Sequence, residues 1–184
     1  MTTGMRVTLA LTVGILATGA RAQAPPTDPQ IVGIVVAANQ IDIDSGKLAL
    51  SKSHNKQVRS FAQQMITDHT AVQKSVFDLG AKLHVSPADS DTSASLKKQA
   101  AESTEQIKGL KGAAFDKAYV YHEVGYHTAV IDAVKNVLIP NAQNAELKSA
   151  LTGTAPMFEG HLEHAKSLQT ELNGKNTTAT NHRK

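Results

Sequence analysis

The stretch Val120–Leu138, with the sequence VYHEVGYHTAVIDAVKNVL, decides the fold. Its apolar residues recur at alternating intervals of four and three, which predicts a helix with one face turned toward a core. His127 stands in this apolar stripe, at a position otherwise filled by aliphatic side chains. His122 lies about 140° away around the helix, so we expect it at the surface. The pattern predicts a helix from about Ala113 to Pro140.

Two earlier stretches have the same spacing, and each carries ionisable side chains within its apolar stripe. The first is expected to begin near Pro29 and carries Asp42. The second is expected to begin near Val58 and carries the adjacent pair Asp68 and His69. Burial of an ionisable group is costly unless the group is paired or holds a metal, so these positions are candidates for a polar site.

The last stretch of this kind is expected to begin after Asn144 as its N-terminal cap, and it carries His161 in its stripe. Pro156 within it removes one backbone donor and is expected to bend the helix. A shorter helix is expected at Thr92–Lys108, before Gly109.

Together these patterns predict an all-α fold, an antiparallel four-helix bundle with one short extra helix. The turn at Ser53–Asn55 is too short for anything other than antiparallel packing of the helices beside it. We expect one bundle domain over residues 30–172. The chain has no cysteine, so the core must be stabilised by packing without disulfides.

The first residues have the features of an export signal. Arg6 precedes an apolar run from Val7 to Ala20, and small residues follow at Ala22 and Ala24. We expect a signal peptide over residues 1–22 and a periplasmic or secreted mature protein. The apolar run is too short to span a membrane, and no later stretch is long and apolar enough. An extended lead is expected at residues 23–29 and a disordered tail at residues 173–184.

The charge of the mature chain does not indicate nucleic-acid binding. Two of the 19 basic residues, Arg6 and Arg21, lie in the expected signal peptide, which leaves 17 basic residues against 16 acidic ones, a net charge of +1. No protein partner is indicated by the sequence.

The inward-facing polar residues form a candidate metal site. Neutral imidazoles together with a carboxylate suit zinc, iron, manganese or copper, and a bundle core can present one ligand from each helix. The expected ligands of a single ion are Asp42, His69, His127 and His161, with Asp68 and Glu123 as additional ligands or as hydrogen-bond partners of the ligands. No Glu-x-x-His motif occurs, which argues against a ferritin-type di-iron centre.

A second interpretation stays open: the same side chains form a metal-free, hydrogen-bonded polar layer that fixes the register of the bundle in a structural, interaction or stress-protection module. The chain has no cysteine nucleophile and no Gly-x-Ser-x-Gly motif. No residue is therefore assigned as catalytic, and the sequence favours a protein that is not an enzyme.

Several other side chains have expected places. Tyr119 and Tyr126 are expected to keep their hydroxyls at the bundle surface. Asp116 is expected in the first turn of its helix, where a negative charge is favourable. Phe61 and Phe77 are expected in the core.

Four segments carry a resemblance to a known family. They are Asp42–Ala49, Phe61–His69, Phe115–Tyr119 with the later His127, and Pro156–Ala165. In this order they resemble the domain of unknown function 4142 family, exported bacterial proteins with a ferritin-like bundle. The resemblance covers about Ile31 to Leu172. It implies the same fold and export from the cytoplasm, and it implies no defined activity.

Overall fold

The computed structural model describes residues 24–181, and within them the side chains through Gly174. The signal peptide expected at residues 1–22 lies outside the described residues. Within residues 24–181 the secondary structure is helical and no strand is present, as predicted.

The first two helices are joined by the expected short turn. Helix α1 spans Asp28–Lys52, and the backbone N–H of Thr27 donates to Gln30 Oε1 at 3.0 Å at its start. Helix α2 spans Lys56–Leu83 and begins at the cap residue Asn55, whose side chain accepts from the backbone N–H of Gln57 at 3.0 Å. These caps satisfy N–H groups that a helix start otherwise leaves unpaired.

Helix α3 spans Asp91–Lys108, close to the expected short helix. Helix α4 spans Gly112–Ala133 and leads into a π-helical turn, η1 (Val134–Leu138), and then into α5 (Ile139–Asn141). The helical segment predicted to end at Pro140 therefore ends one residue later, at Asn141. Pro140 stands in the first turn of α5, where its missing N–H is tolerated.

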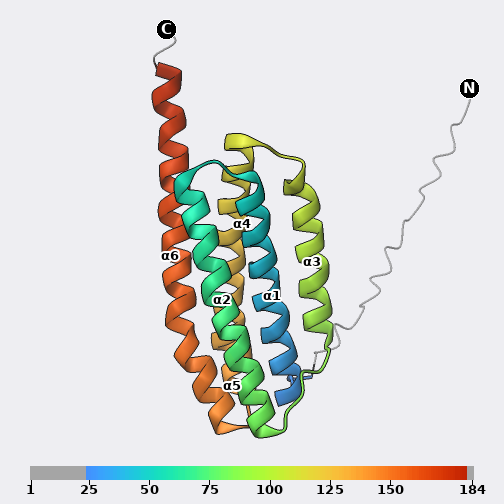
Figure 1. The fold of residues 1–184 in the computed structure, drawn as a ribbon. Coiled ribbons are helices and arrows are strands. Elements are labelled where there is room, and N and C mark those ends of the chain that lie inside the picture. Colours follow the sequence, from blue (N-terminus) through green and yellow to red (C-terminus); the bar gives the residue numbers. More distant parts are fainter. Residues whose placement is uncertain (1–23, 182–184) are drawn as a thin grey trace, which may run out of the picture.

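Helix α6 spans Ala145–Asn181 and continues through Pro156. Its start is confirmed, because the Asn144 side chain accepts from the backbone N–H of Glu146 at 2.9 Å. Its end differs from the expected boundary at Leu172, since the helix runs on to Asn181 and projects beyond the other helices (Figure 1).

The four long helices form a closed ring in which α1 packs on α2, α2 on α6, α6 on α4, and α4 on α1. Helix α3 lies outside this ring against α1 and α4 (Figure 1). Gly46 allows the close approach of α1 and α2, because a Cβ atom there would lie 2.9 Å from the backbone oxygen of Ala62.

The core of the bundle consists of two separate apolar clusters. One surrounds Phe61, Phe115 and Leu168, and the other surrounds Ile31, Leu151 and Phe158. Phe77 belongs to neither cluster and is 47% exposed, so the prediction that it is a core residue is wrong. Its neighbour Val76 takes the inward position on α2 instead. The region between the two clusters is polar.

No helix within residues 24–181 has the combination of length and apolar composition that a bilayer span requires.

Candidate metal centre

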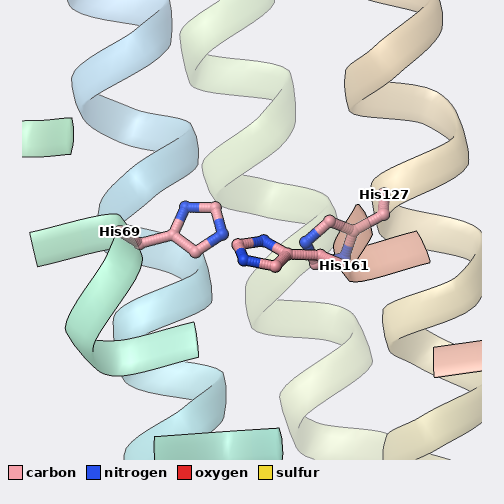
Figure 2. A group of neighbouring side chains, drawn as sticks. All are labelled: His69, His127 and His161. Atoms are coloured by element: carbon pink, nitrogen blue, oxygen red, sulfur yellow. The ribbon is translucent and has the colours of Figure 1, made fainter. Parts of the chain in front are cut away.

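Each long helix contributes one of the predicted side chains to the polar layer between the two apolar clusters. Asp42 comes from α1, His69 from α2, His127 from α4 and His161 from α6, and none is more than 2% exposed. Figure 2 shows the three imidazole rings pointing toward one another from their separate helices. The structure thus brings together the four residues expected to meet.

The three histidine rings lie close to one another. Ring centroids are 5.8 Å apart for His69 and His127, 5.3 Å for His69 and His161, and 5.4 Å for His127 and His161. Each ring offers one nitrogen such that the three nitrogens lie within 4.8 Å of one another. The layer therefore contains a cluster of potential nitrogen ligands.

The outer nitrogen of His69 is held by Asn39. The Asn39 amide nitrogen donates to the backbone oxygen of Val35 at 2.8 Å, which identifies the other amide atom as the oxygen. This Oδ1 lies 2.9 Å from His69 Nδ1. Because an amide oxygen only accepts, His69 Nδ1 is the donor, and Nε2 of the neutral ring carries a lone pair.

The other two rings are oriented in the same way. His127 Nδ1 donates to the backbone oxygen of Glu123 at 3.0 Å, and His161 Nε2 donates to Asp68 Oδ2 at 2.9 Å. The inner nitrogens are His69 Nε2, His127 Nε2 and His161 Nδ1, and each is buried without a hydrogen-bond partner among the described residues. Asp68 thus has the expected role of an acceptor for a ring N–H.

Two carboxyl groups lie beside the histidines. Asp42 Oδ2 is 3.2 Å from His69 Nε2 and 3.8 Å from His127 Nε2. Glu123 accepts a hydrogen bond from Ser45 Oγ at 2.7 Å, and its Oε2 is 3.5 Å from His127 Nδ1. Atoms of Asp42, Glu123 and His127 also lie within 4.8 Å of one another. The carboxyl groups of Asp42 and Glu123 therefore lie directly beside the histidine cluster.

Burial keeps the three imidazoles neutral. Removal from water lowers the pKa of His69 from 6.5 to about 3 and that of His127 from 6.5 to about 4. Burial also lowers the pKa of His161, although the carboxylate of Asp68 opposes this effect. Neutral imidazole is the form that binds a metal ion, so the lone pairs remain available at neutral pH.

Burial has the opposite effect on the two acids. It raises the pKa of Asp42 well above 3.8, and the nearby Glu123 raises it further. Burial raises the pKa of Glu123 from 4.5 to about 7, although the hydrogen bond from Ser45 acts in the other direction. A cation in the layer would favour the ionised form of both carboxyl groups.

Some predicted positions around the site are corrected by the structure. Tyr119 is fully buried and does not bring its hydroxyl to the surface. Because α4 begins at Gly112, Asp116 lies beyond the first turn in which it was expected, and it is only 6% exposed. His122 is half-buried, because α3 covers it and Ser103 Oγ lies 2.9 Å from its Nδ1. The short helix α3 packs on the face that the sequence pattern left to solvent.

Sequence reasoning missed two polar residues of the layer, Asn39 and Ser45. Asn39 is 2% exposed and lies three positions before Asp42 on α1, hence on the same face. Ser45 lies three positions after Asp42 and reaches Glu123. A search for polar residues one turn on either side of Asp42 would have found both.

Comparison with known proteins assigns the chain to a family. A family model described as "Domain of unknown function (DUF4142)" matches residues 15–168 of the chain. No curated protein and no solved structure matches the chain.

Proposed function

Because the chain belongs to the domain of unknown function 4142 family, whose name gives no activity, we propose a function from its own side chains. The bundle binds a single transition-metal ion in its core. His69, His127 and His161 supply nitrogen ligands, and Asp42 supplies a carboxylate oxygen. Asp68 and Asn39 orient two of the rings, and Glu123 lies beside the site as a further acid.

The observation that supports this proposal most strongly is the orientation of the three imidazole rings. Every outer ring nitrogen donates to an acceptor, so each inner nitrogen presents a lone pair to the same small region. A buried acceptor that lacks a donor costs about 1–3 kcal/mol. Metal-binding histidines characteristically have their other nitrogen held in this way, since that bond fixes the tautomer and the ring plane.

A metal-free polar layer is the second candidate, and the contact of Asp42 Oδ2 with His69 Nε2 at 3.2 Å favours it. A protonated Asp42 could donate to that nitrogen. This single proton leaves His127 Nε2 and His161 Nδ1 without a donor among the described residues. The metal-bound layer accounts for all three nitrogens, which is why we prefer it.

The donor set suits a borderline metal ion. Three imidazole nitrogens and one carboxylate oxygen are compatible with zinc, iron, manganese or copper, whereas magnesium and calcium prefer oxygen ligands. We assign no oxygen chemistry to the site.

Titration of the chelator-treated protein tests the proposal. Isothermal titration with Zn²⁺, Mn²⁺, Cu²⁺ or anaerobic Fe²⁺ is expected to show one ion bound per chain for at least one metal. His161→Gln should weaken this binding strongly. His164→Gln is the matched control, because His164 lies one turn away on α6 with its ring toward Gln64.

Equal metal binding by the two variants, or no binding by the unmodified protein, would contradict the proposed ligands. Circular dichroism of both variants establishes that they are folded. A metal-free layer instead predicts that His161→Gln lowers only the melting temperature.

We also propose that the protein is exported. The basic residue Arg6, the apolar run from Val7 and the small residues near Ala22 support this proposal. Expression in a Gram-negative host, followed by mass spectrometry of the periplasmic fraction, is expected to give a chain that begins at Gln23 or Pro25. A chain retaining residues 1–22 in the cytoplasmic fraction would contradict export.

A further inference from the structure

A large cavity lies next to the polar layer, and most of its wall takes no part in the proposed metal binding. Its volume is about 420 Å³, and its walls come from α1, α2, α3, α4, η1 and α6. Most of the wall is aliphatic, with Val35, Val72, Leu96 and Val130 among its residues. By comparison, an apolar cavity of about 150 Å³ is enough to hold a benzene molecule.

One end of the cavity reaches the polar layer. Asp42 and His69 both line it, although each is only 2% exposed. Asp42 Oδ1 and His69 Nε2 are buried atoms without a hydrogen-bond partner among the described residues. The cavity therefore combines a mostly apolar wall with hydrogen-bonding groups beside the polar layer, which is the usual composition of a small-molecule site.

The charges on the wall restrict the ligand. None of the described residues that line the cavity is lysine or arginine, and Asp42 is the only acid among them. An anionic ligand would enter an apolar space without a counter-charge and would meet a carboxyl group at its end, which is unfavourable.

Exposed residues of α3 and α4 form part of the cavity wall, which points to an opening between these two helices. Tyr121, Gly125 and Ala129 line it from α4 and are exposed, and Gln99 does so from α3. Helix α3 lies outside the four-helix ring and contacts α1 and α4 (Figure 1). A ligand can therefore enter along α3 without separation of the four long helices.

We propose that this cavity binds one uncharged, largely apolar molecule with a single hydrogen-bonding group, of the class of medium-chain alcohols. The polar group lies at Asp42 and His69, and the hydrocarbon part occupies the aliphatic space beneath α3. Binding depends on the apolar wall of the cavity and does not require a metal ion, although its polar end shares Asp42 and His69 with the proposed metal site.

A competition experiment on the chelator-treated protein tests the proposal. The probe is N-phenyl-1-naphthylamine, an uncharged apolar dye whose fluorescence rises in apolar surroundings. The protein is expected to bind the dye, and 1-decanol is expected to displace it at concentrations at least about tenfold lower than decanoate, because the anion lacks a counter-charge in the cavity. Absence of dye binding, or equal displacement by decanol and decanoate, would overturn the proposal.

Variants that fill the cavity provide a second test of the proposal. Ala100 on α3 lines the cavity, whereas the next residue, Ala101, is exposed and does not. Ala100→Trp is expected to lower dye affinity at least about tenfold, and Ala101→Trp should leave it unchanged. Leu96→Trp, which also fills the cavity from α3, replaces Ala100→Trp if that variant does not fold. Unchanged dye affinity in a folded cavity variant would show that the dye binds elsewhere and would refute the assignment.

Discussion

Replacement of Glu123 by Gln is expected to change the pH dependence of stability. Burial raises the pKa of Glu123 from 4.5 to about 7 in the folded protein. Between these values the unfolded chain has released the proton and the folded protein has kept it. The metal-free protein therefore loses stability from this group as the pH rises from about 4.5 to about 7.

The magnitude follows from the displacement of the pKa. Each pKa unit corresponds to about 1.4 kcal/mol, so ionisation of Glu123 costs on the order of 3 kcal/mol of folding free energy above about pH 7. Gln at this position has nearly the same shape as the protonated acid, and its oxygen can still accept from Ser45. The buried histidines are present in both proteins, so their contribution largely cancels in the difference. Loss of the Glu123 charge also lowers the pKa of Asp42, which acts in the same direction.

Urea unfolding with a chelator, followed by far-ultraviolet circular dichroism, measures this difference. Relative to the unmodified protein, Glu123→Gln should gain on the order of 3 kcal/mol between about pH 4 and about pH 8. Glu163→Gln is the control, since Glu163 is exposed and its replacement should give no such trend. A constant stability difference between Glu123→Gln and the unmodified protein across this range would refute the reasoning.

Three further perturbations have defined outcomes. Asn39→Leu removes the acceptor of His69 Nδ1 and is expected to weaken metal affinity about 10–100-fold in calorimetric titration, and unchanged affinity would show that Asn39 does not orient a ligand. Gly33→Ala places a Cβ 2.0 Å from the backbone oxygen of Ala88 and should lower the free energy of unfolding in urea by about 1–3 kcal/mol. Gly153→Ala, whose Cβ has no atom within 4 Å, should leave that free energy unchanged or raise it. Similar values for the two variants would contradict the proposed clash. Phe61→Ala should cost about 3–5 kcal/mol and Phe77→Ala far less, because Phe61 is fully buried and Phe77 is 47% exposed; the reverse order would contradict the division between core and surface.

Most of the fold could be predicted because the apolar spacing along each helix is regular. The positions of Asp42, His69, His127 and His161 within those stripes also predicted that they would face the core. Periodicity could not show that the four side chains lie at the same level along the bundle axis. The spacing of residues within one helix does not fix how far the neighbouring helices are shifted along that axis. That depth depends on the lengths of the turns and on close contacts such as that at Gly46.

One group of differences between prediction and structure has a single physical origin. Helical spacing indicates which face of a helix is buried by the ring of four, but it carries no information on additional elements that cover the outer faces. Helix α3 half-buries His122 in this way and forms one wall of the large cavity. Tyr119 has a different cause: it is turned fully inward because Phe61 and Phe115, from the ring of four helices, pack around its ring.

The separation of the core into two apolar clusters has a consequence for how the molecule opens. Since the side chains around Phe61 and those around Phe158 belong to different clusters, each end can undergo local unfolding while the other end stays intact. Backbone amides near these two residues are therefore expected to exchange with deuterium at unequal rates. Cooperativity along the length of the protein then depends on the side chains in the middle, where all four long helices meet.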